Sequence, residues 1–441
     1  MDNTLVVRGG IPLSGMVSVY GSKNSASKLM VASLLSEKTS LIENVPLSGE
    51  IDITRELCES VGSRVILTPD HRCEIQTKDI TTSLVPEMSR KNRIPILAIG
   101  PLLHRTGRAE IPFLGGDKIG HRPIDFHIKA LGELGVRVRQ QERSYIVEAD
   151  TIRGATIDLP FPSVGATENI ILTAALAHGK TLIKNAAVEP EILQLVEMLI
   201  LMGASIRVEE FSRQIEINGV RTLTGARIRV MPDRNEIVSF VCAILATGGD
   251  AYVADISSDY ILEFLKKITE IGANFEEKDQ GIRFWGKAPN RAAQITTEPH
   301  PGFMTDWQQP FSILLTRAQG ESIIHETVYE DRFGYTRDLT RMGVDIEITD
   351  KCPQGENCRF SEKSFRHVAK IRGPVILHGT EITMTDIRAG MAHIIAALAA
   401  GGESVISGIE HIDRGYERID QRLRALGANI RREEGKGERV K

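Results

Sequence analysis

The chain has few cysteines, no long apolar run and no excess of basic charge. Its longest apolar stretches, such as Met391 to Ala400, are too short to span a bilayer. The N-terminal residues lack a basic segment followed by an apolar core, which a signal peptide requires. We therefore expect a cytoplasmic protein without a membrane segment.

The charge balance excludes another class of protein. The 54 basic and 58 acidic residues are interspersed and give a formal net charge of -4. A nucleic-acid-binding protein usually has a basic face that is visible in this balance. We expect no nucleic-acid partner, and any anion-binding site must be local.

With 441 residues, of which 41% are hydrophobic, the chain is long enough for two lobes with substantial cores.

The five cysteines are scattered without a CxxC pair, and we expect reduced thiols. Cys352 and Cys358 share a polar stretch that could close a small disulfide loop or contribute to a metal site. The sequence suggests no cluster of histidines and cysteines that completes four ligands around them. We therefore expect an exposed loop and no metal there.

One short motif recurs along the chain: an apolar residue, glycine, a small residue, a polar residue and a β-prone residue. Before the last copy, Ile419, Leu423 and Leu426 have helical spacing, so its glycine is expected to end a helix just before a strand. The glycines lie 68 to 84 residues apart, at Gly62, Gly135, Gly203, Gly272, Gly343 and Gly427.

A second helix is expected in every repeat, and it ends at a turn of small residues before another strand. The six expected helices are Lys28 to Leu35, Pro95 to Leu103, Asn169 to Ala177, Ile237 to Ala246, Pro310 to Thr316, and Gly390 to Ala400. We predict six α/β units, three to a lobe, with helices inward and sheets outward. The longest spacing reflects an insertion from Thr349 to Arg372, which we expect to be a solvated loop.

Polar residues gather in two loops of the repeat. The first loop precedes the inner helix, where unpaired N–H groups and the helix dipole favour anions. Its copies are Gly21–Asn24, Arg90–Arg93, Pro162–Thr167, Asp233–Glu236, Thr305–Asp306 and Thr385–Arg388. The second loop includes residues 115–123, 330–332 and 411–415. Basic side chains from these loops suit phosphate and carboxylate, which predicts anionic phosphorylated substrates in a cleft between the lobes.

Simpler interpretations exist for each of these residues. Asp306 and Asp386 both follow threonine just before a helix, so either one could be only an N-cap. Ser163 could cap its helix without binding a ligand. His127 and His411 are more typical of structural histidines than of catalysts.

Seven motifs together resemble the UDP-N-acetylglucosamine 1-carboxyvinyltransferases, enolpyruvyl transferases of peptidoglycan precursor synthesis. They are Gly21–Asn24, Arg122–His127, Ser163–Thr167, Asn185–Glu191, Thr305–Asp306, Thr385–Ala389 and His411–Glu417. The resemblance covers nearly the whole chain. It implies a two-lobed inside-out α/β barrel, with residues 23–231 as the first lobe and a lid loop at 112–123. Residues 1–22 and 232–441 form the second lobe.

The resemblance also implies a role for each site residue. Phosphoenolpyruvate or phosphate is surrounded by Lys23, Arg93, Arg122, Arg332, Arg388 and Arg414. The uridine nucleotide-sugar is lined by Asn24, Asp125, Ser163, Val164, Gly165 and Val328. Asp306 is the general base for the sugar 3-hydroxyl, and Asp386 helps to manage charge or a proton. The chemistry implies no metal and no organic cofactor, and the sequence does not indicate whether there is a protein partner.

The sequence departs from the family pattern at several positions. Asp117 stands in the lid loop where many members have cysteine, so we expect a catalytic carboxylic acid and resistance to fosfomycin, which alkylates that thiol. Asn235–Val238 and Tyr335–Arg337 are also unusual. Shikimate 3-phosphate or another uridine nucleotide therefore remains an alternative acceptor, and so does a non-catalytic nucleotide-sugar-binding role. Lys23–Asn24 and Ser163–Gly165 favour the nucleotide sugar.

Overall fold

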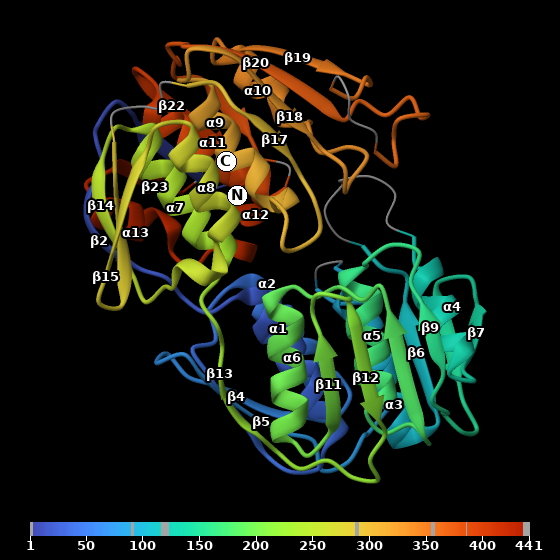
Figure 1. Cartoon of the computed structure of the whole chain (residues 1–441). Coiled ribbons are helices and arrows are strands. Elements are labelled where there is room, and N and C mark those ends of the chain that lie inside the picture. Colours follow the sequence, from blue (N-terminus) through green and yellow to red (C-terminus); the bar gives the residue numbers. More distant parts are fainter. Residues whose placement is uncertain are drawn as a thin grey trace, which may run out of the picture. The chain divides into compact units, whose positions relative to one another are not determined.

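The computed structural model of the chain describes residues 3–89, 92–115, 123–286, 291–353, 358–384 and 386–434. These residues divide into two compact units. The terminal unit contains residues 3–19 and 232–434, and the middle unit contains residues 20–115 and 123–231. Each unit has its own cluster of buried apolar side chains, so each has a separate hydrophobic core. The fold is mixed α/β (Figure 1).

The described part of the middle unit has three sheets, in the strand orders β13-β3-β5-β4, β11-β12-β10-β9 and β6-β8-β7. Parallel and antiparallel pairs are mixed, because β3 is parallel to β13 but antiparallel to β5. The strands are β3 (Ser40–Glu43), β4 (Arg64–Leu67), β5 (Arg72–Gln76), β6 (Arg108–Pro112), β7 (Arg137–Gln140), β8 (Ser144–Glu148), β9 (Thr156–Asp158), β10 (Lys180–Lys184), β11 (Ser205–Glu209), β12 (Gln214–Asn218) and β13 (Arg227–Arg229).

The described part of the terminal unit also has three sheets, in the orders β21-β22-β1-β23, β15-β16-β14-β2 and β17-β18-β20-β19. The N-terminal strands β1 (Thr4–Arg8) and β2 (Ser14–Ser18) belong here: β1 is antiparallel to β22 and β23, and β2 is parallel to β14. The other strands are β14 (Asp250–Ala254), β15 (Asn274–Lys278), β16 (Gly281–Trp285), β17 (Gln294–Thr296), β18 (Gly320–His325), β19 (Asp345–Thr349), β20 (Val368–Gly373), β21 (Glu381–Thr383), β22 (Glu403–Ser407) and β23 (Asn429–Glu433).

The inner helices of each unit pack against one another. In the terminal unit, α7 (Arg234–Ala246), α9 (Gln308–Leu315) and α11 (Ile387–Ala399) are in mutual contact. Every residue of α7 and α9 is buried, as expected for helices at the centre of a unit. In the middle unit, α5 (Val164–Ala174) contacts α3 (Ile99–Thr106) and α6 (Pro190–Leu201), and α6 contacts α1 (Lys23–Ala32). Strands such as β11 and β19 expose alternate residues, so one face of their sheets meets solvent.

Further helices complete the two units. The middle unit adds η1 (Ser33–Leu35), α2 (Gly49–Ser60), η2 (Ile94–Ala98) and α4 (Asp125–Glu133). The terminal unit adds η3 (Ser258–Tyr260), α8 (Leu262–Glu270), η4 (Thr305–Trp307), α10 (Thr336–Arg341), α12 (Glu410–Gly415) and α13 (Ile419–Ala425). Among the described residues, no helix has the length and apolar character needed to cross a membrane.

All six motif glycines adopt positive φ, between 85° and 114°. Each one lies between a helix and a strand: the helices are α2, α4, α6, α8, α10 and α13, and the strands are β4, β7, β11, β15, β19 and β23. This backbone conformation is unfavourable for residues with a Cβ and common at the C′ position of helices. The predicted order of helix, glycine and strand is confirmed at Gly427, and the structure shows the same order at the other five positions.

Two local predictions were wrong. The inner helices begin earlier than expected: α7 starts at Arg234 and α11 at Ile387, because Asp233 and Asp386 accept hydrogen bonds from first-turn amides. The insertion from Thr349 to Arg372 is not simply a solvated loop, because it contains most of β20 and the fully buried side chains of Phe360 and His367. Apolar packing therefore fixes part of this segment.

Candidate functional site

Asp306 lies between two arginines in the terminal unit. Its Oδ1 accepts a hydrogen bond from Arg332 Nη2 at 2.6 Å, and its Oδ2 accepts one from Arg388 Nε at 3.1 Å. The carboxylate side chain is 22% exposed, whereas the two arginine side chains are 3% and 7% exposed. Two buried guanidinium groups thus converge on a carboxylate that solvent reaches, an arrangement that can also bind an anion.

Arg388 is held from a second side by an aromatic side chain. Its Nη1 donates to Tyr416 Oη at 2.8 Å, and Tyr416 Oη is 2.7 Å from Ser239 Oγ of α7. The Arg388 guanidinium also lies 5.6 Å from the centroid of the Tyr416 ring. Burial opposes the charge on Arg388, but Tyr416 and Asp306 outweigh it and raise the pKa of the guanidinium. The arginine is therefore fixed in position and charged.

Arg332 has its own supports. Burial again disfavours its charge, yet Asp306 and Glu326 raise the pKa of the guanidinium above its usual value. In the amide orientation that satisfies its neighbours, Gln309 accepts from Arg332 Nη2 at 3.1 Å and from Nε at 3.0 Å. The Arg332 guanidinium lies 5.4 Å from the Tyr329 ring centroid. These contacts fix the direction in which its N–H groups point.

The two Thr-Asp pairs have different roles. Asp386 is the N-cap of α11 and accepts from the amides of Arg388 and Ala389, both at 2.9 Å. Asp306 instead lies within η4 and makes the two ion pairs described above. The N-cap interpretation is thus confirmed for Asp386 and wrong for Asp306, because Asp306 finds stronger partners on distant segments.

Two further predicted residues lie in the same unit. Arg414 is on α12, which packs against α11. Val328 lies in the turn after β18, where its amide donates to Glu326 Oε1 at 2.8 Å. Glu326 is fully buried and its Oε2 accepts from Thr305 Oγ1 at 2.8 Å. Glu326 thus connects the turn that contains Val328 to the residue that precedes Asp306.

In the middle unit, the predicted residues lie at the starts of helices. Lys23 and Asn24 begin α1, where Lys23 Nζ donates to Asn24 Oδ1 at 3.1 Å. Lys23 is only 8% exposed, so its ammonium group is largely removed from water. Arg93 is the N-cap residue of η2. Positive side chains therefore lie beside N-termini that already favour anions.

His127 connects two of these helix starts. It lies on α4, two residues after the exposed Asp125, and its Nδ1 is 3.2 Å from Asn169 Nδ2 of α5. A Cβ added to Gly165 would come within 3.3 Å of the His127 ring. Burial, aided by the charge of Arg93, lowers the pKa of His127 to about 3. His127 is thus a neutral structural residue that packs against the start of α5.

Ser163 and Val164 complete the start of α5. Ser163 is the N-cap, with Oγ accepting from the Ala166 amide at 3.4 Å, and Val164 is 38% exposed. The structure therefore places Gly165 beside the buried His127, with Ser163 and Val164 just before it at the start of α5 and Asp125 on the same helix as the histidine. Two predicted residues, Asp117 and Arg122, lie outside the described residues.

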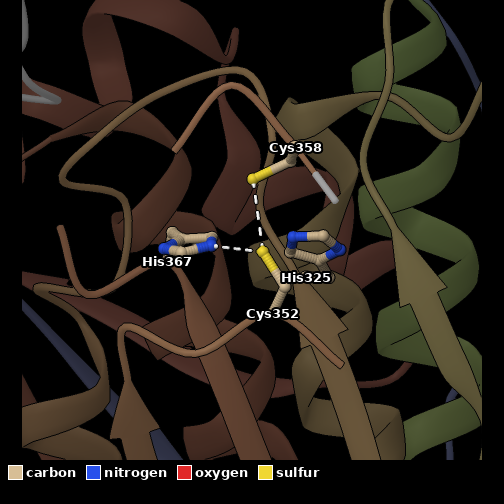
Figure 2. Close-up of side chains that lie close together, drawn as sticks. All are labelled: His325, Cys352, Cys358 and His367. Atoms are coloured by element: carbon tan, nitrogen blue, oxygen red, sulfur yellow. Dashed lines mark hydrogen bonds between the residues drawn. The ribbon is translucent and has the colours of Figure 1, made fainter. Parts of the chain in front are cut away.

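One group of side chains was missed in the sequence. The prediction that no histidines complete the ligand set around Cys352 and Cys358 was wrong, because His325 and His367 lie beside them (Figure 2). No spacing motif could indicate it, since His325 is 27 residues before Cys352 in the chain. The antiparallel register of β18 and β20, which pairs His325 with Val368, brings the first histidine next to His367.

Comparison with known proteins identifies similar chains. The family model described as EPSP synthase (3-phosphoshikimate 1-carboxyvinyltransferase) matches residues 7–436. A UDP-N-acetylglucosamine 1-carboxyvinyltransferase of Protochlamydia amoebophila is 45% identical, covering 97% of this chain and 94% of that protein. Enzymes of the same name from Chlamydia abortus and Zymomonas mobilis are 43% and 39% identical, covering 96% and 97% of this chain and 97% and 98% of theirs.

Solved structures agree on the fold. The enolpyruvyl transferase NikO from Streptomyces tendae has a TM-score of 0.85 at 22% identity, covering 98% of this chain and 99% of its own. An EPSP synthase from Acinetobacter baumannii has a TM-score of 0.70 at 17% identity, covering 98% of this chain and 100% of its own. The α/β fold is therefore that of the enolpyruvyl transferases.

Proposed function

The chain belongs to the UDP-N-acetylglucosamine 1-carboxyvinyltransferase family, and from this premise we propose that it transfers the enolpyruvyl group of phosphoenolpyruvate to the 3-hydroxyl of UDP-N-acetylglucosamine. Phosphate is released, and the product enters peptidoglycan precursor synthesis. The observation that carries the proposal is the Asp306 carboxylate held between the buried guanidinium groups of Arg332 and Arg388. The carboxylate supplies a base, and the two guanidinium groups beside it supply a site for an anion.

In the proposed reaction, Asp306 accepts the proton of the sugar 3-hydroxyl while that oxygen bonds to C2 of phosphoenolpyruvate. C3 gains a proton in the same step, and we assign its delivery to Asp117. Asp117 then takes a proton back from C3 as phosphate leaves C2, which restores the double bond, and the leaving phosphate takes up the proton held by Asp306. No atom of the enzyme is consumed.

Arg332 and Arg388 have two tasks in this scheme. They bind the phosphate or carboxylate of phosphoenolpyruvate, and they stabilise the charge that develops as phosphate leaves. An anion bound there competes for the N–H groups that otherwise pair with Asp306. The carboxylate then loses part of its stabilisation and becomes a stronger base when substrate is bound.

We assign Lys23, Arg93, Arg122 and Arg414 to the same anion, and a supporting charge to Asp386.

The start of α5 is proposed as the nucleotide-sugar site. Backbone N–H groups at Val164 and Gly165 suit the diphosphate, because a helix N-terminus attracts anions. We assign the N-cap residue Ser163 to the same site. Asn24, Asp125 and Val328 add polar and backbone groups. The neutral His127 supports this site without adding a charge that pH could change in the physiological range.

We also propose the finer architecture that the sequence indicates: six repeated units, three per lobe, in an inside-out arrangement. The lobes are residues 23–231, with the lid loop 112–123, and residues 1–22 with 232–441. The six glycines at helix ends support the repeat. A cytoplasmic location is proposed as well, and no metal or organic cofactor takes part in the transfer.

Phosphate release tests the function. Purified protein receives phosphoenolpyruvate with UDP-N-acetylglucosamine, with shikimate 3-phosphate, with another uridine nucleotide sugar, or with no acceptor. We expect release only with UDP-N-acetylglucosamine. Release only with another acceptor would reassign the substrate. Nucleotide-sugar binding without release from any mixture would support the non-catalytic alternative and reject enolpyruvyl transfer.

A further inference from the structure

Two histidines and two cysteines of the terminal unit bring their potential ligand atoms together. His325 ends β18, Cys352 and Cys358 follow β19, and His367 directly precedes β20. One atom from each side chain, a ring nitrogen or a sulfur, lies within 4.8 Å of all the others. Figure 2 shows the other three side chains gathered around Cys352. We refer to these four residues as the Cys2His2 cluster.

The measured separations fit one tetrahedral metal ion. Cys352 Sγ is 3.6 Å from Cys358 Sγ and 3.3 Å from His367 Nε2. In a tetrahedral zinc site, bonds of about 2.3 Å to sulfur and about 2.0–2.1 Å to nitrogen place the ligand atoms roughly 3.3–3.8 Å apart. For its own pair of atoms, roughly 3.8 Å for two sulfurs and 3.5 Å for a sulfur and a nitrogen, each separation is shorter by only about 0.2 Å. The ligands therefore need little movement to surround an ion.

The surroundings prepare the ligand atoms for a metal. His367 Nδ1 is 2.7 Å from the carbonyl oxygen of Phe365. A carbonyl only accepts hydrogen bonds, so Nδ1 carries the proton and Nε2 directs its lone pair toward Cys352 Sγ, which is the usual arrangement of a metal-bound histidine. The Phe360 amide donates to Cys358 Sγ at 3.3 Å, which suits a sulfur that carries negative charge.

The cluster is also shielded as structural metal sites are. His325 and His367 are 1% and 0% exposed. The fully buried Phe360 packs its ring 5.6 Å from that of His367. Among the residues that the structure describes, this is the one group of at least three histidine, cysteine or acidic side chains whose ligand atoms lie close enough together to hold a metal ion. The proposed enolpyruvyl transfer makes no use of it.

A disulfide between Cys352 and Cys358 is the simpler alternative. The two thiols are close and not bonded to each other. A disulfide, however, uses only the two sulfurs and gives no role to the two buried imidazoles or to the Nε2 directed at sulfur. A metal ion accounts for all four side chains.

We propose that the Cys2His2 cluster binds one zinc ion as a closed structural site. Two thiolates and two imidazoles are a ligand set typical of Zn²⁺, and four protein ligands leave no position for a substrate. The ion fastens the segment between β19 and β20 onto the ends of β18 and β20. It contributes stability because the unfolded chain does not preform the site.

The site is connected to the candidate catalytic residues by one turn. The Glu326 amide donates to the carbonyl oxygen of His367 at 2.8 Å. Glu326 in turn accepts from Thr305 Oγ1 and from the amides of Val328 and Tyr329, at 2.8, 2.8 and 3.0 Å. Zinc at the cluster therefore anchors the turn that leads to Arg332 and the residue preceding Asp306. The cluster residues are positioning residues, and this consequence rests on the proposed function.

Metal content tests the site directly. Full-length protein is purified under reducing conditions, incubated with zinc chloride, passed through a desalting column and analysed by mass spectrometry of the elements. We expect about one zinc per chain. The double variant Cys352→Ser with Cys358→Ser should retain less than a tenth of it, and the control His378→Ala, which changes an exposed histidine of the same unit, should retain all. No zinc in the wild type, or equal zinc in the double variant, overturns the proposal.

Two further measurements need only the wild-type chain, so a variant that fails to fold does not block the test. Cobalt chloride added to the metal-free protein should give thiolate-to-cobalt absorption and the visible bands of tetrahedral Co²⁺; no such bands would contradict the site. Thiol titration in denaturant, without reductant and with a chelator, should count five thiols. Three thiols together with no zinc would establish the disulfide instead.

Activity separates the metal site from the function. Removing zinc with a chelator should lower the melting temperature by several degrees and raise KM for phosphoenolpyruvate several-fold, with both effects reversed by added zinc. A chain that binds zinc but shows no transfer with any acceptor would reject the proposed function and leave the zinc site intact. Unchanged melting temperature after complete zinc removal would reject the structural role.

Discussion

Asp306 and Arg388 are 82 residues apart in the sequence, yet Arg388 Nε donates to Asp306 Oδ2 at 3.1 Å. The other carboxylate oxygen is engaged by Arg332. Each oxygen thus faces a different guanidinium, which fixes the carboxylate plane and places two positive charges beside it. In the proposed function, substrate anions and Asp306 compete for the same donors, and this competition underlies the predictions for the proposed active site.

Replacing Asp306 by asparagine should lower kcat by about 10²- to 10⁴-fold, because the amide cannot accept the proton of the sugar hydroxyl. KM for phosphoenolpyruvate should stay the same or fall, since the two arginines lose a competing carboxylate. Steady-state kinetics at saturating UDP-N-acetylglucosamine give both constants. Asp345→Asn is the matched control, because Asp345 is 61% exposed and pairs only at the surface with Arg372. A large rise in KM for phosphoenolpyruvate with unchanged kcat would show that Asp306 is not the base.

Replacing Tyr416 by phenylalanine should destabilise the protein by about 1–3 kcal/mol, since Arg388 and Ser239 both lose a buried partner. KM for phosphoenolpyruvate should rise more than kcat falls, because Arg388 loses the contact that positions it. Urea unfolding and initial rates measure the two effects. Tyr252→Phe is the control, as the Tyr252 hydroxyl donates to the carbonyl of Asp279 in an exposed position. Equal behaviour of the two variants would contradict the positioning role.

Replacing Gly165 by alanine should raise KM for UDP-N-acetylglucosamine several-fold and leave KM for phosphoenolpyruvate unchanged. The new Cβ would approach the His127 ring to 3.3 Å, so the start of α5 or the histidine must shift. Gly132→Ala on α4 is a matched control, because no heavy atom lies within 4 Å of its added Cβ. That substitution should leave both KM values unchanged and stabilise the helix by about 0.5–1 kcal/mol. A normal nucleotide-sugar KM in Gly165→Ala would argue against binding at this helix start.

Replacing Glu168 by glutamine should make stability less dependent on pH. Burial raises the pKa of Glu168 to about 7, against the opposing charge of Lys28. Between the usual value near 4.5 and about 7, the unfolded carboxyl loses its proton first, so wild-type stability falls as pH rises, by roughly 1.4 kcal/mol per pH unit for this group. Denaturant unfolding at pH 5 and pH 8 should show that Glu168→Gln raises the free energy of unfolding, relative to the wild type, more at pH 8 than at pH 5. The exposed Glu142→Gln should show no such difference. An equal effect of Glu168→Gln at both pH values would contradict the buried carboxyl.

Fosfomycin should neither label nor inhibit the wild-type chain, because Asp117 offers no thiol at the proposed lid position. The variant Asp117→Cys should gain one covalent adduct, detected by mass spectrometry of the intact protein, and lose activity over time. An adduct on the wild-type lid peptide would show that another nucleophile reacts there and that this prediction is wrong.

Local chemistry explains which features were predictable from the sequence. The six glycines and the cap at Asp386 depend on residues within one turn, so the sequence indicates them directly. Thr305–Asp306 and Thr385–Asp386 look alike locally, and only contacts with Arg332 and Arg388 separate their roles. The Cys2His2 cluster depends on strand register between β18 and β20, which no short motif encodes.

The product formed from UDP-N-acetylglucosamine and phosphoenolpyruvate tests the central claim most directly. NMR of the purified nucleotide product should show an enolpyruvyl ether on the 3-oxygen of the sugar, formed in amounts equal to the phosphate released. Recovery of the nucleotide sugar unchanged, or an enolpyruvyl group on another position or another acceptor, would contradict transfer to the sugar 3-hydroxyl.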